Sequence, residues 1–176
     1  EENTFNLDPV SIEKNISKNT KAIMAIDIFG HSANMNEIMK IAKKNNLKVI
    51  SDSAQSPGSI YKGVKTGTLA DVGGYSLNYH KHIHTGEGGI IVTNNDEIAE
   101  KLKLIRNHAE GVVSQKGVTN ITNMIGYNFR LGEIESAIGI EQLKKLQSIT
   151  EKRQLLAKRL NEGIKNLKGL QIPFVE

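Results

Sequence analysis

The segment that decides the fold is residues 21–52, KAIMAIDIFGHSANMNEIMKIAKKNNLKVISD. It opens with an isoleucine-rich apolar run over 21–29, closed by Gly30, which is typical of a buried strand. Residues 36–45 place apolar side chains at helical spacing, and a second apolar run, 47–52, follows at once. Because a strand, a helix and a strand with short connections favour a right-handed crossover, the sequence predicts an α/β fold with a parallel sheet.

Further elements extend this pattern toward the C-terminus. Residues 71–77 and 88–93 are two more strand candidates, and 96–106 reads as an amphipathic helix that starts in the cap region Asn94-Asn95. After a polar stretch over 110–123, apolar residues recur at intervals of three to five through the last part of the chain. This periodicity predicts one long helix, or two helices with a bend.

Composition narrows the classes of function. The 176 residues fit one domain, and because the chain begins without methionine we expect it to be a section of a longer polypeptide. The lack of cysteine excludes disulfides and thiolate chemistry and fits the cytoplasm, and no apolar run approaches the roughly 18 residues of a membrane span. The net charge of +4 is spread over helical stretches. We therefore expect solvated helix faces and no nucleic-acid partner.

Two polar residues stand at the end of the second apolar run. Asp52 ends this run, at the edge of a parallel sheet where ligands usually bind, and a buried carboxylate there needs a cationic partner. A protonated ring nitrogen would serve, and Gln55 could hydrogen-bond a ring substituent or stack on the ring. The alternative is that Asp52 only caps the following turn and that Gln55 is exposed.

Residues 76–89, SLNYHKHIHTGEGG, contain the most reactive side chains. Ser76 ends a predicted strand, and its hydroxyl with nearby backbone N–H groups could hold a phosphate. Lys81 returns toward the same edge, where an amine near other positive charge loses its proton more readily and can form a Schiff base with an aldehyde. The glycine-rich turn lacks the order of a P-loop and is interpreted as a tight strand connection.

A metal site is the competing interpretation of this stretch. His80, His82 and His84 alternate, so a strand would place all three on one face. Lys81 would then lie on the other face, and Glu87 is the only acidic ligand nearby. We therefore expect no metal, and a surface or packing role for the histidines rather than a place at the substrate entrance.

The order of these motifs resembles a known family. Residues 51–111, SDSAQSPGSIYKGVKTGTLADVGGYSLNYHKHIHTGEGGIIVTNNDEIAEKLKLIRNHAEG, and 126–146, GYNFRLGEIESAIGIEQLKKL, are similar to the sugar aminotransferases typified by DegT, DnrJ, EryC1 and StrS. These are pyridoxal phosphate enzymes of the aspartate-aminotransferase fold type. The resemblance runs from about residue 5 to residue 149.

The resemblance implies a role for each candidate residue. Asp52 would pair with the pyridine nitrogen, and Gln55 would contact the cofactor ring or its 3-oxygen. Ser76 would bind the cofactor phosphate, Lys81 would be the Schiff-base lysine, and Asn128 would reach the phosphate of the neighbouring subunit. Shared active sites of this kind imply a homodimer.

The resemblance also implies an architecture and an activity. We expect a three-layer, mainly parallel α/β sheet that is incomplete here, with the central part of the large cofactor-binding domain over 1–130. A long helix over 131–176 would lead toward a missing small C-terminal domain. The expected reaction is transamination of a nucleotide-linked keto-sugar, with glutamate as the amino donor, in the biosynthesis of a polysaccharide or a small metabolite.

Two alternatives to a transaminase stay open. One branch of the family replaces the lysine with histidine and becomes a sugar dehydratase, but counting back four residues from Thr85 gives Lys81. The chain could instead be a non-catalytic relative, or a fragment that acts only in interactions through its long helices. One departure from the family pattern is Ser51, which stands where an acidic residue usually precedes the aspartate.

Overall fold

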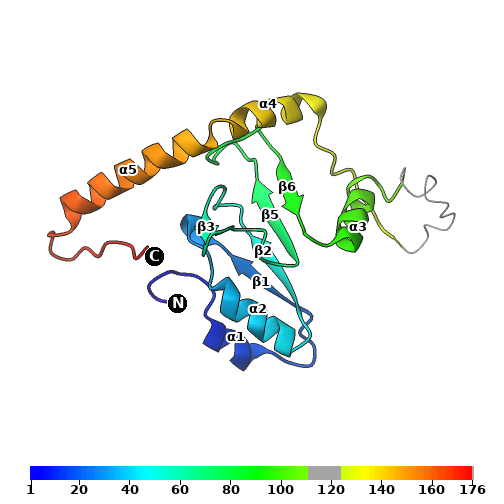
Figure 1. The fold of residues 1–176 in the computed structure, drawn as a ribbon, viewed down its shortest axis with the longest axis horizontal. Coiled ribbons are helices and arrows are strands. Elements are labelled where there is room, and N and C mark those ends of the chain that lie inside the picture. The colour runs from blue at the N-terminus through cyan, green and yellow to red at the C-terminus, as the bar shows by residue number, and fades with distance from the viewer. Residues whose placement is uncertain (111–123, 176) are drawn as a thin grey trace.

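The computed structural model describes residues 1–110 and 124–175, and its centre is a four-stranded sheet (Figure 1). The strands lie in the order β1-β2-β5-β6, where β1 is Ala22–Ile26, β2 is Lys48–Asp52, β5 is Val72–Ser76 and β6 is Gly89–Val92. β1, β2 and β5 are mutually parallel, whereas β6 runs antiparallel to β5. The expected α/β class with a mainly parallel sheet is therefore confirmed.

The predicted strand–helix–strand unit forms β1, α2 (Met35–Lys44) and β2. β1 ends earlier than the apolar run predicts, because Phe29 adopts a positive φ of 56° in the short 3-10 turn η1 (Ile28–Gly30). A helix that was not predicted, α1 (Pro9–Asn15), precedes the unit. Asp8 caps it by accepting hydrogen bonds from two backbone N–H groups of its first turn.

The hydrophobic core lies between helices α1 and α2 and one face of the sheet. Its buried members are Ile12, Ile23, Ala25, Ala33, Met35, Ile38, Ile41, Ala42 and Val49. Side chains alternate along a strand, so the other face carries Met24 and Ile26 of β1, which are 58% and 43% exposed. We call this the open face of the sheet. Figure 1 shows α1 and α2 side by side next to β1 and β2.

The second half of the chain surrounds this unit. An antiparallel hairpin of β3 (Ile60–Tyr61) and β4 (Val64–Lys65), which was not predicted, lies between β2 and β5 in sequence. The predicted helix after β6 is α3 (Asp96–Arg106), and Asn95 caps it by accepting from the N–H of Ile98. The polar stretch at 111–123 lies outside the described residues.

The C-terminal periodicity forms two helices rather than one. α4 (Glu133–Leu143) and α5 (Leu146–Ile164) are separated by Lys144 and Lys145, and they run across the end of the sheet in Figure 1. Both helices approach the rest of the chain closely at a glycine. A Cβ on Gly58 would lie 3.5 Å from Leu146 of α5, and a Cβ on Gly139 of α4 would lie 3.2 Å from Thr85. The bend was one of the two predicted arrangements.

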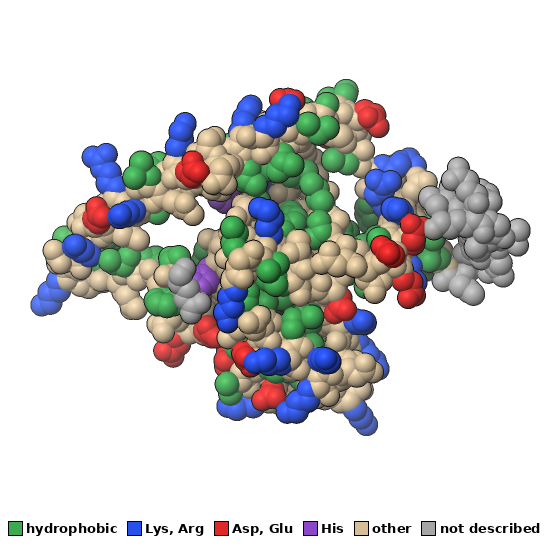
Figure 2. All heavy atoms as spheres, in the orientation of Figure 1, with side chains coloured by type: hydrophobic (Ala, Val, Ile, Leu, Met, Phe, Trp, Pro, Cys, Tyr) green, Lys and Arg blue, Asp and Glu red, His purple; other side chains and the backbone are tan. Residues whose placement is uncertain are grey.

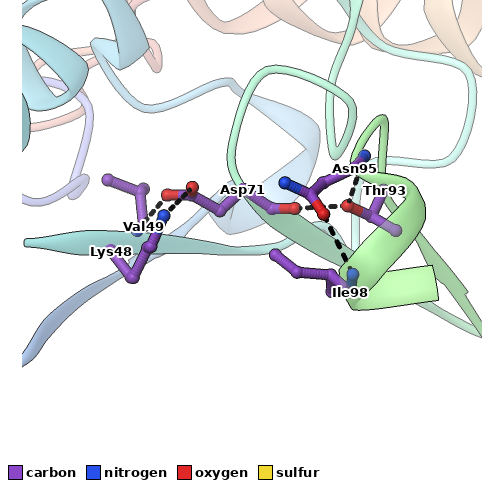
Figure 3. A network of polar contacts seen from close by, with 6 residues as sticks. All are labelled: Lys48, Val49, Asp71, Thr93, Asn95 and Ile98. Atoms are coloured by element: carbon purple, nitrogen blue, oxygen red, sulfur yellow. Dashed lines mark hydrogen bonds and ion pairs between the residues drawn. The ribbon is translucent and has the colours of Figure 1, made fainter. Parts of the chain in front are cut away.

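A polar network ties the strands together at the amino edge of the sheet (Figure 3). The carboxylate of Asp71 accepts from the backbone N–H of Val49 at 2.8 Å and from Lys48 Nζ at 3.1 Å. Its backbone carbonyl accepts from the hydroxyl of Thr93 at 2.6 Å. Asp71 therefore links β2 to β5 and β6 at the edge that faces away from the predicted ligand site.

Lysine and arginine side chains are scattered over the visible surface (Figure 2). Among the described residues, four form exposed ion pairs within or at the end of a helix: Lys40 with Glu37, Lys101 with Glu97, Lys103 with Glu100, and Lys144 with Glu141. Exposed pairs of this kind contribute little to stability and are typical of solvated helix faces. Among the described residues, no helix combines the length and the apolar character needed to cross a membrane.

Candidate functional site

Asp52 is the last residue of β2 and lies on the open face of the sheet. Val49 and Ser51 are buried on the covered face, so alternation places Asp52 opposite them. Its Oδ1 accepts a hydrogen bond from the N–H of Ala54 at 3.0 Å. Within the described chain, Oδ2 has no hydrogen-bond partner. Asp52 therefore caps the turn with one oxygen, as the alternative interpretation held, and keeps the other available for a ligand.

Ser76 occupies the equivalent end of the neighbouring strand. β2 and β5 pair Asp52 with Gly74, and partners in a parallel pair share a face. Ser76, two positions beyond Gly74, is therefore on the same open face, about 7 Å further along the strand direction. Its Oγ accepts from the N–H of Asn78 at 3.2 Å, which leaves the hydroxyl hydrogen free to donate.

Lys81 lies in the loop of residues 77–88, which joins β5 to β6 at the carboxyl edge of the sheet. The base of this loop is closed by hydrogen bonds from Leu77 N–H to the Gly88 carbonyl and from Thr85 N–H to the Leu77 carbonyl, at 2.9 and 3.0 Å. The Lys81 N–H donates to the Asn78 carbonyl at 2.9 Å. The side chain of Lys81 is half-buried, and its Nζ makes no hydrogen bond or ion pair with any described residue. Such an amine is available to react with a carbonyl carbon.

The three histidines lie in the loop of residues 77–88 rather than on a strand, so the one-face placement that a strand would give them does not form. Within residues 1–110 and 124–175, no group of three or more potential ligands is arranged to hold a metal ion. His80 packs on Tyr79 with 3.8 Å between ring centroids. Burial lowers the pKa of His82, and the positive charges of Arg153 and Lys81 lower it further.

Gln55 is half-buried and engaged, rather than exposed as the alternative interpretation held. Its Oε1 accepts from the backbone N–H of Phe29 at 2.8 Å, which holds the positive-φ turn that follows β1. The amide nitrogen of Gln55 has no partner among the residues of the described chain. Contact between Gln55 and a ring remains a prediction.

Asn128 is not part of this cluster. It is exposed and pairs in an isolated bridge with Asn107, beyond the end of α3. Arg130 strengthens this link, because its guanidinium donates to Asn107 Oδ1 at 2.7 Å. No hydrogen bond joins Asn128 to Asp52, Ser76 or Lys81. Its predicted role toward a neighbouring subunit stays a prediction.

A buried carboxylate that no sequence motif indicated lies behind Asp52. Asp27 is 0% exposed and accepts hydrogen bonds from the hydroxyls of Ser51 and Ser53, the two residues that flank Asp52. A signal was present, because an acidic residue inside the first apolar run and the closely spaced serines of SDSAQS each require polar partners if the strands are buried.

The arrangement at the carboxyl edge has a definite chemical character. Asp52 offers an unpaired carboxylate oxygen, Ser76 offers a hydroxyl donor on the same face, and Lys81 offers an amine in the adjoining loop. These groups suit a ligand that carries a protonated ring nitrogen, a phosphate and an aldehyde. The donor set therefore fits pyridoxal phosphate.

Comparison with known proteins gives a family for the whole chain. The model of the DegT/DnrJ/EryC1/StrS aminotransferase family matches residues 1–176. A dTDP-3-amino-3,6-dideoxy-alpha-D-galactopyranose transaminase from Aneurinibacillus thermoaerophilus is 42% identical over 165 residues, which cover 93% of this chain and 44% of that protein.

Two solved structures have the same fold. An aminotransferase from Psychrobacter cryohalolentis superposes with a TM-score of 0.91 at 29% identity, over 99% of this chain and 47% of the other. The Escherichia coli GDP-4-keto-6-deoxy-D-mannose-3-dehydratase with bound hydrated pyridoxal phosphate superposes with a TM-score of 0.86 at 30% identity, over 99% of this chain and 48% of the other. The chain thus spans less than half the length of each of these proteins.

Proposed function

This chain belongs to the DegT/DnrJ/EryC1/StrS aminotransferase family, and from that membership we propose that it is the cofactor-binding core of a pyridoxal-phosphate-dependent nucleotide-sugar aminotransferase. Residues 1–130 would form the central part of the large domain, and 131–176 the helical connection toward a small domain. The observation that carries the proposal is the common placement of Asp52 and Ser76 on the open face, with Lys81 in the loop that follows.

Each residue would make a separate contribution to the reaction. The Lys81 amine would hold the cofactor through its aldehyde carbon, with loss of water, until the amino group of the donor takes its place at that carbon. The freed Lys81 amine would then carry the proton at the amino-donor carbon. Asp52 would keep a proton on the ring nitrogen through its free Oδ2, and Ser76 would donate to the phosphate. The bound cofactor supplies an electron sink for breaking the bond at that carbon.

The relatives support a class of substrate, and the amino donor and the assembly are further parts of the proposal. A nucleotide-linked keto-sugar is the proposed amino acceptor, because the transaminase relative acts on a dTDP-linked amino sugar. Glutamate is the proposed donor. The proposal includes a homodimer in which Asn128 reaches the partner's cofactor, and a cytoplasmic location, which a sequence without cysteine accommodates.

The decisive experiment is chemical trapping in the complete polypeptide. Borohydride makes the bond between the lysine nitrogen and the cofactor carbon permanent, so peptide mapping will place the cofactor on Lys81. Lys81→Ala is expected to abolish the absorbance band of the lysine-bound form of the cofactor. Labelling of Lys62 or Lys65, which lie on and beside the β3–β4 hairpin, would show that the assignment is wrong.

A dehydratase is the second candidate, supported by the structural match to the Escherichia coli 3-dehydratase. Lysine rather than histidine at position 81 favours transamination. The two reactions differ in their products, because only a transaminase leaves nitrogen in the sugar. Incubation with nitrogen-labelled glutamate and a nucleotide-linked keto-sugar, followed by mass spectrometry of the sugar, separates them. Failure of both reactions in a complete polypeptide that folds would support a non-catalytic role.

A further inference from the structure

The carboxylate of Asp27 is fully buried and surrounded by donors. Oδ1 accepts from the N–H of Ala33 at 3.0 Å. Oδ2 accepts from the hydroxyls of Ser51 at 3.1 Å, Ser53 at 2.6 Å and Ser56 at 3.4 Å. Burial of a carboxylate is costly unless its oxygens are hydrogen-bonded, so four donors around one side chain mark a site built around its charge.

The donors bracket the candidate ligand of the ring nitrogen. Ser51 and Ser53 precede and follow Asp52, and both point to the covered face, where Asp27 holds them. The backbone N–H of Asp27 donates directly to the carbonyl of Asp52 at 2.9 Å. Asp27 therefore fixes the main chain on both sides of Asp52 and directs the Asp52 carboxylate toward the open face.

The same network extends to the strand that carries Ser76. The hydroxyls of Ser56 and Thr66 are 3.0 Å apart, and the Tyr75 hydroxyl donates to the Thr66 carbonyl. Burial raises the pKa of Tyr75, and the negative charge of Asp27 raises it further, so the phenol remains a donor. Tyr75 directly precedes Ser76, so one buried network connects the ends of all three parallel strands.

We propose that Asp27 is a positioning residue for the cofactor site, acting through Ser51 and Ser53 on Asp52. The inference rests on the proposed function, because it assigns Asp27 a task only if Asp52 meets a ring nitrogen. It also gives the Ser51 hydroxyl a role, which is to hold the main chain before Asp52. The buried carboxylate of Asp27, the residue that follows β1, lies 3.1 Å from that hydroxyl.

The test uses the complete polypeptide and the pH at which the visible absorbance of the bound cofactor changes. If Asp52 no longer stabilises the protonated ring nitrogen, the ring loses its positive charge. The nitrogen of Lys81 that is bonded to the cofactor then has one positive charge fewer nearby, so it keeps its own proton to higher pH. Asp27→Asn preserves shape but removes the charge that holds Ser51 and Ser53. We expect this variant to raise the midpoint pH of the absorbance change by about half a pH unit or more, in the same direction as Asp52→Asn.

A double-mutant cycle distinguishes positioning from general support. If Asp27 acts through Asp52, Asp27→Asn will add no shift in the Asp52→Asn background. Asp71→Asn is the matched control, because Asp71 also links β2 to β5, at the opposite edge of the sheet (Figure 3). It is expected to lower the unfolding temperature and leave the midpoint unchanged.

Three results would overturn the inference: an unchanged midpoint in Asp27→Asn, a shift that recurs in full without Asp52, or an equal shift in Asp71→Asn. If Asp27→Asn does not fold, Ser53→Ala decides the question, since it removes the shortest bond to Asp27 and leaves the other three donors. A smaller shift in the same direction supports the inference, and the absence of any shift overturns it. A wild-type polypeptide that binds no pyridoxal phosphate would defeat the proposed function itself, which is a distinct outcome.

Discussion

At the scale of single residues, the two carboxylate oxygens of Asp52 have different roles. Oδ1 caps the turn at Ala54, and an asparagine oxygen can replace it there. An amide cannot keep a proton on a ring nitrogen, so Asp52→Asn in the complete polypeptide is expected to bind pyridoxal phosphate but to lose turnover by orders of magnitude. Cofactor titration and steady-state kinetics measure the two effects. Unimpaired turnover would mean that Asp52 is only a turn cap.

His82 has a pH dependence whose direction follows from its surroundings. Its pKa is lowered by burial, then by Arg153 and Lys81, so the unfolded chain takes up the proton first as pH falls. The resulting stability is complete above the ordinary histidine pKa of 6.5 and is lost as pH falls through the native value.

Arg153→Ala is expected to raise the pKa of His82, and an NMR titration of the imidazole measures the change. Lys158→Ala is the control, because it removes a different cation from the same helix, α5. The contribution of His82 to acid sensitivity should fall with Arg153→Ala and stay the same with Lys158→Ala. Equal pKa shifts in the two variants would assign the effect to the charge of the whole helix.

At the scale of elements, β5 contains two adjacent glycines with opposite surroundings. A Cβ on Gly73 would lie 1.9 Å from the carbonyl oxygen of Gly67, whereas a Cβ on Gly74 would meet nothing within 4 Å. Gly73→Ala must push the backbone near Gly67 away, and we expect a loss of about 3 kcal/mol or more in the free energy of unfolding. Gly74→Ala is expected to change it by less than about 1 kcal/mol. Denaturant unfolding of the 176-residue chain measures both, and similar losses would contradict the packing argument.

Periodicity predicted the long elements and missed the short ones. The apolar runs around Ile23 and Val49 and the helical spacing of α2 and α3 are local patterns, and the structure confirms them. α1 has a single buried residue, Ile12, so its sequence carries almost no amphipathic signal. The β3–β4 hairpin has two residues in each strand, and its turn depends on Lys62 and Gly63 at positive φ.

The residues of the candidate site could be predicted from the sequence, but the contacts that hold them in position could not. Asp52 and Ser76 follow strand candidates, so their common edge could be inferred from the α/β pattern. The common face of these two residues depends on the pairing of β2 with β5, and the role of Asp27 depends on contacts between residues more than 20 positions apart. Spacing within one segment cannot supply such contacts.

At the scale of the whole molecule, this chain spans less than half of its relatives, and its sheet has an open face on which Ile91 of β6 is 59% exposed. We expect the 176-residue chain to bind pyridoxal phosphate much more weakly than the complete polypeptide does. Each lost charge-assisted hydrogen bond to the phosphate costs about 1.5–3 kcal/mol, or roughly one to two decades in affinity. Titration with sedimentation of both proteins measures affinity and mass together. Tight binding by a monomeric 176-residue chain would contradict this expectation.

The same titration tests the proposed role of Asn128 at the partner's cofactor phosphate. If the complete polypeptide forms the proposed dimer, Asn128→Ala is expected to weaken cofactor binding by roughly one decade or more without changing the mass of the assembly. Asn107→Ala is its control, because Asn107 is the bridge partner of Asn128 and its side chain accepts the hydrogen bond from Arg130. An equal effect of the two variants would assign the loss to the bridge rather than to contact with the partner's phosphate.

The reversed direction of β6 has a consequence for the order in which the chain folds. Ser76 pairs with Gly89 across one loop, whereas Ala22 pairs with Lys48, and Asp52 with Gly74, across longer sequence separations. Closing a shorter loop costs less chain entropy, so the β5–β6 hairpin is expected to form first. Pulse-labelling hydrogen exchange during refolding would then protect the amides of β5 and β6 before that of Val49. A refolding chain would thus present Lys81 on a formed hairpin before it holds the carboxylate of Asp52 beside it.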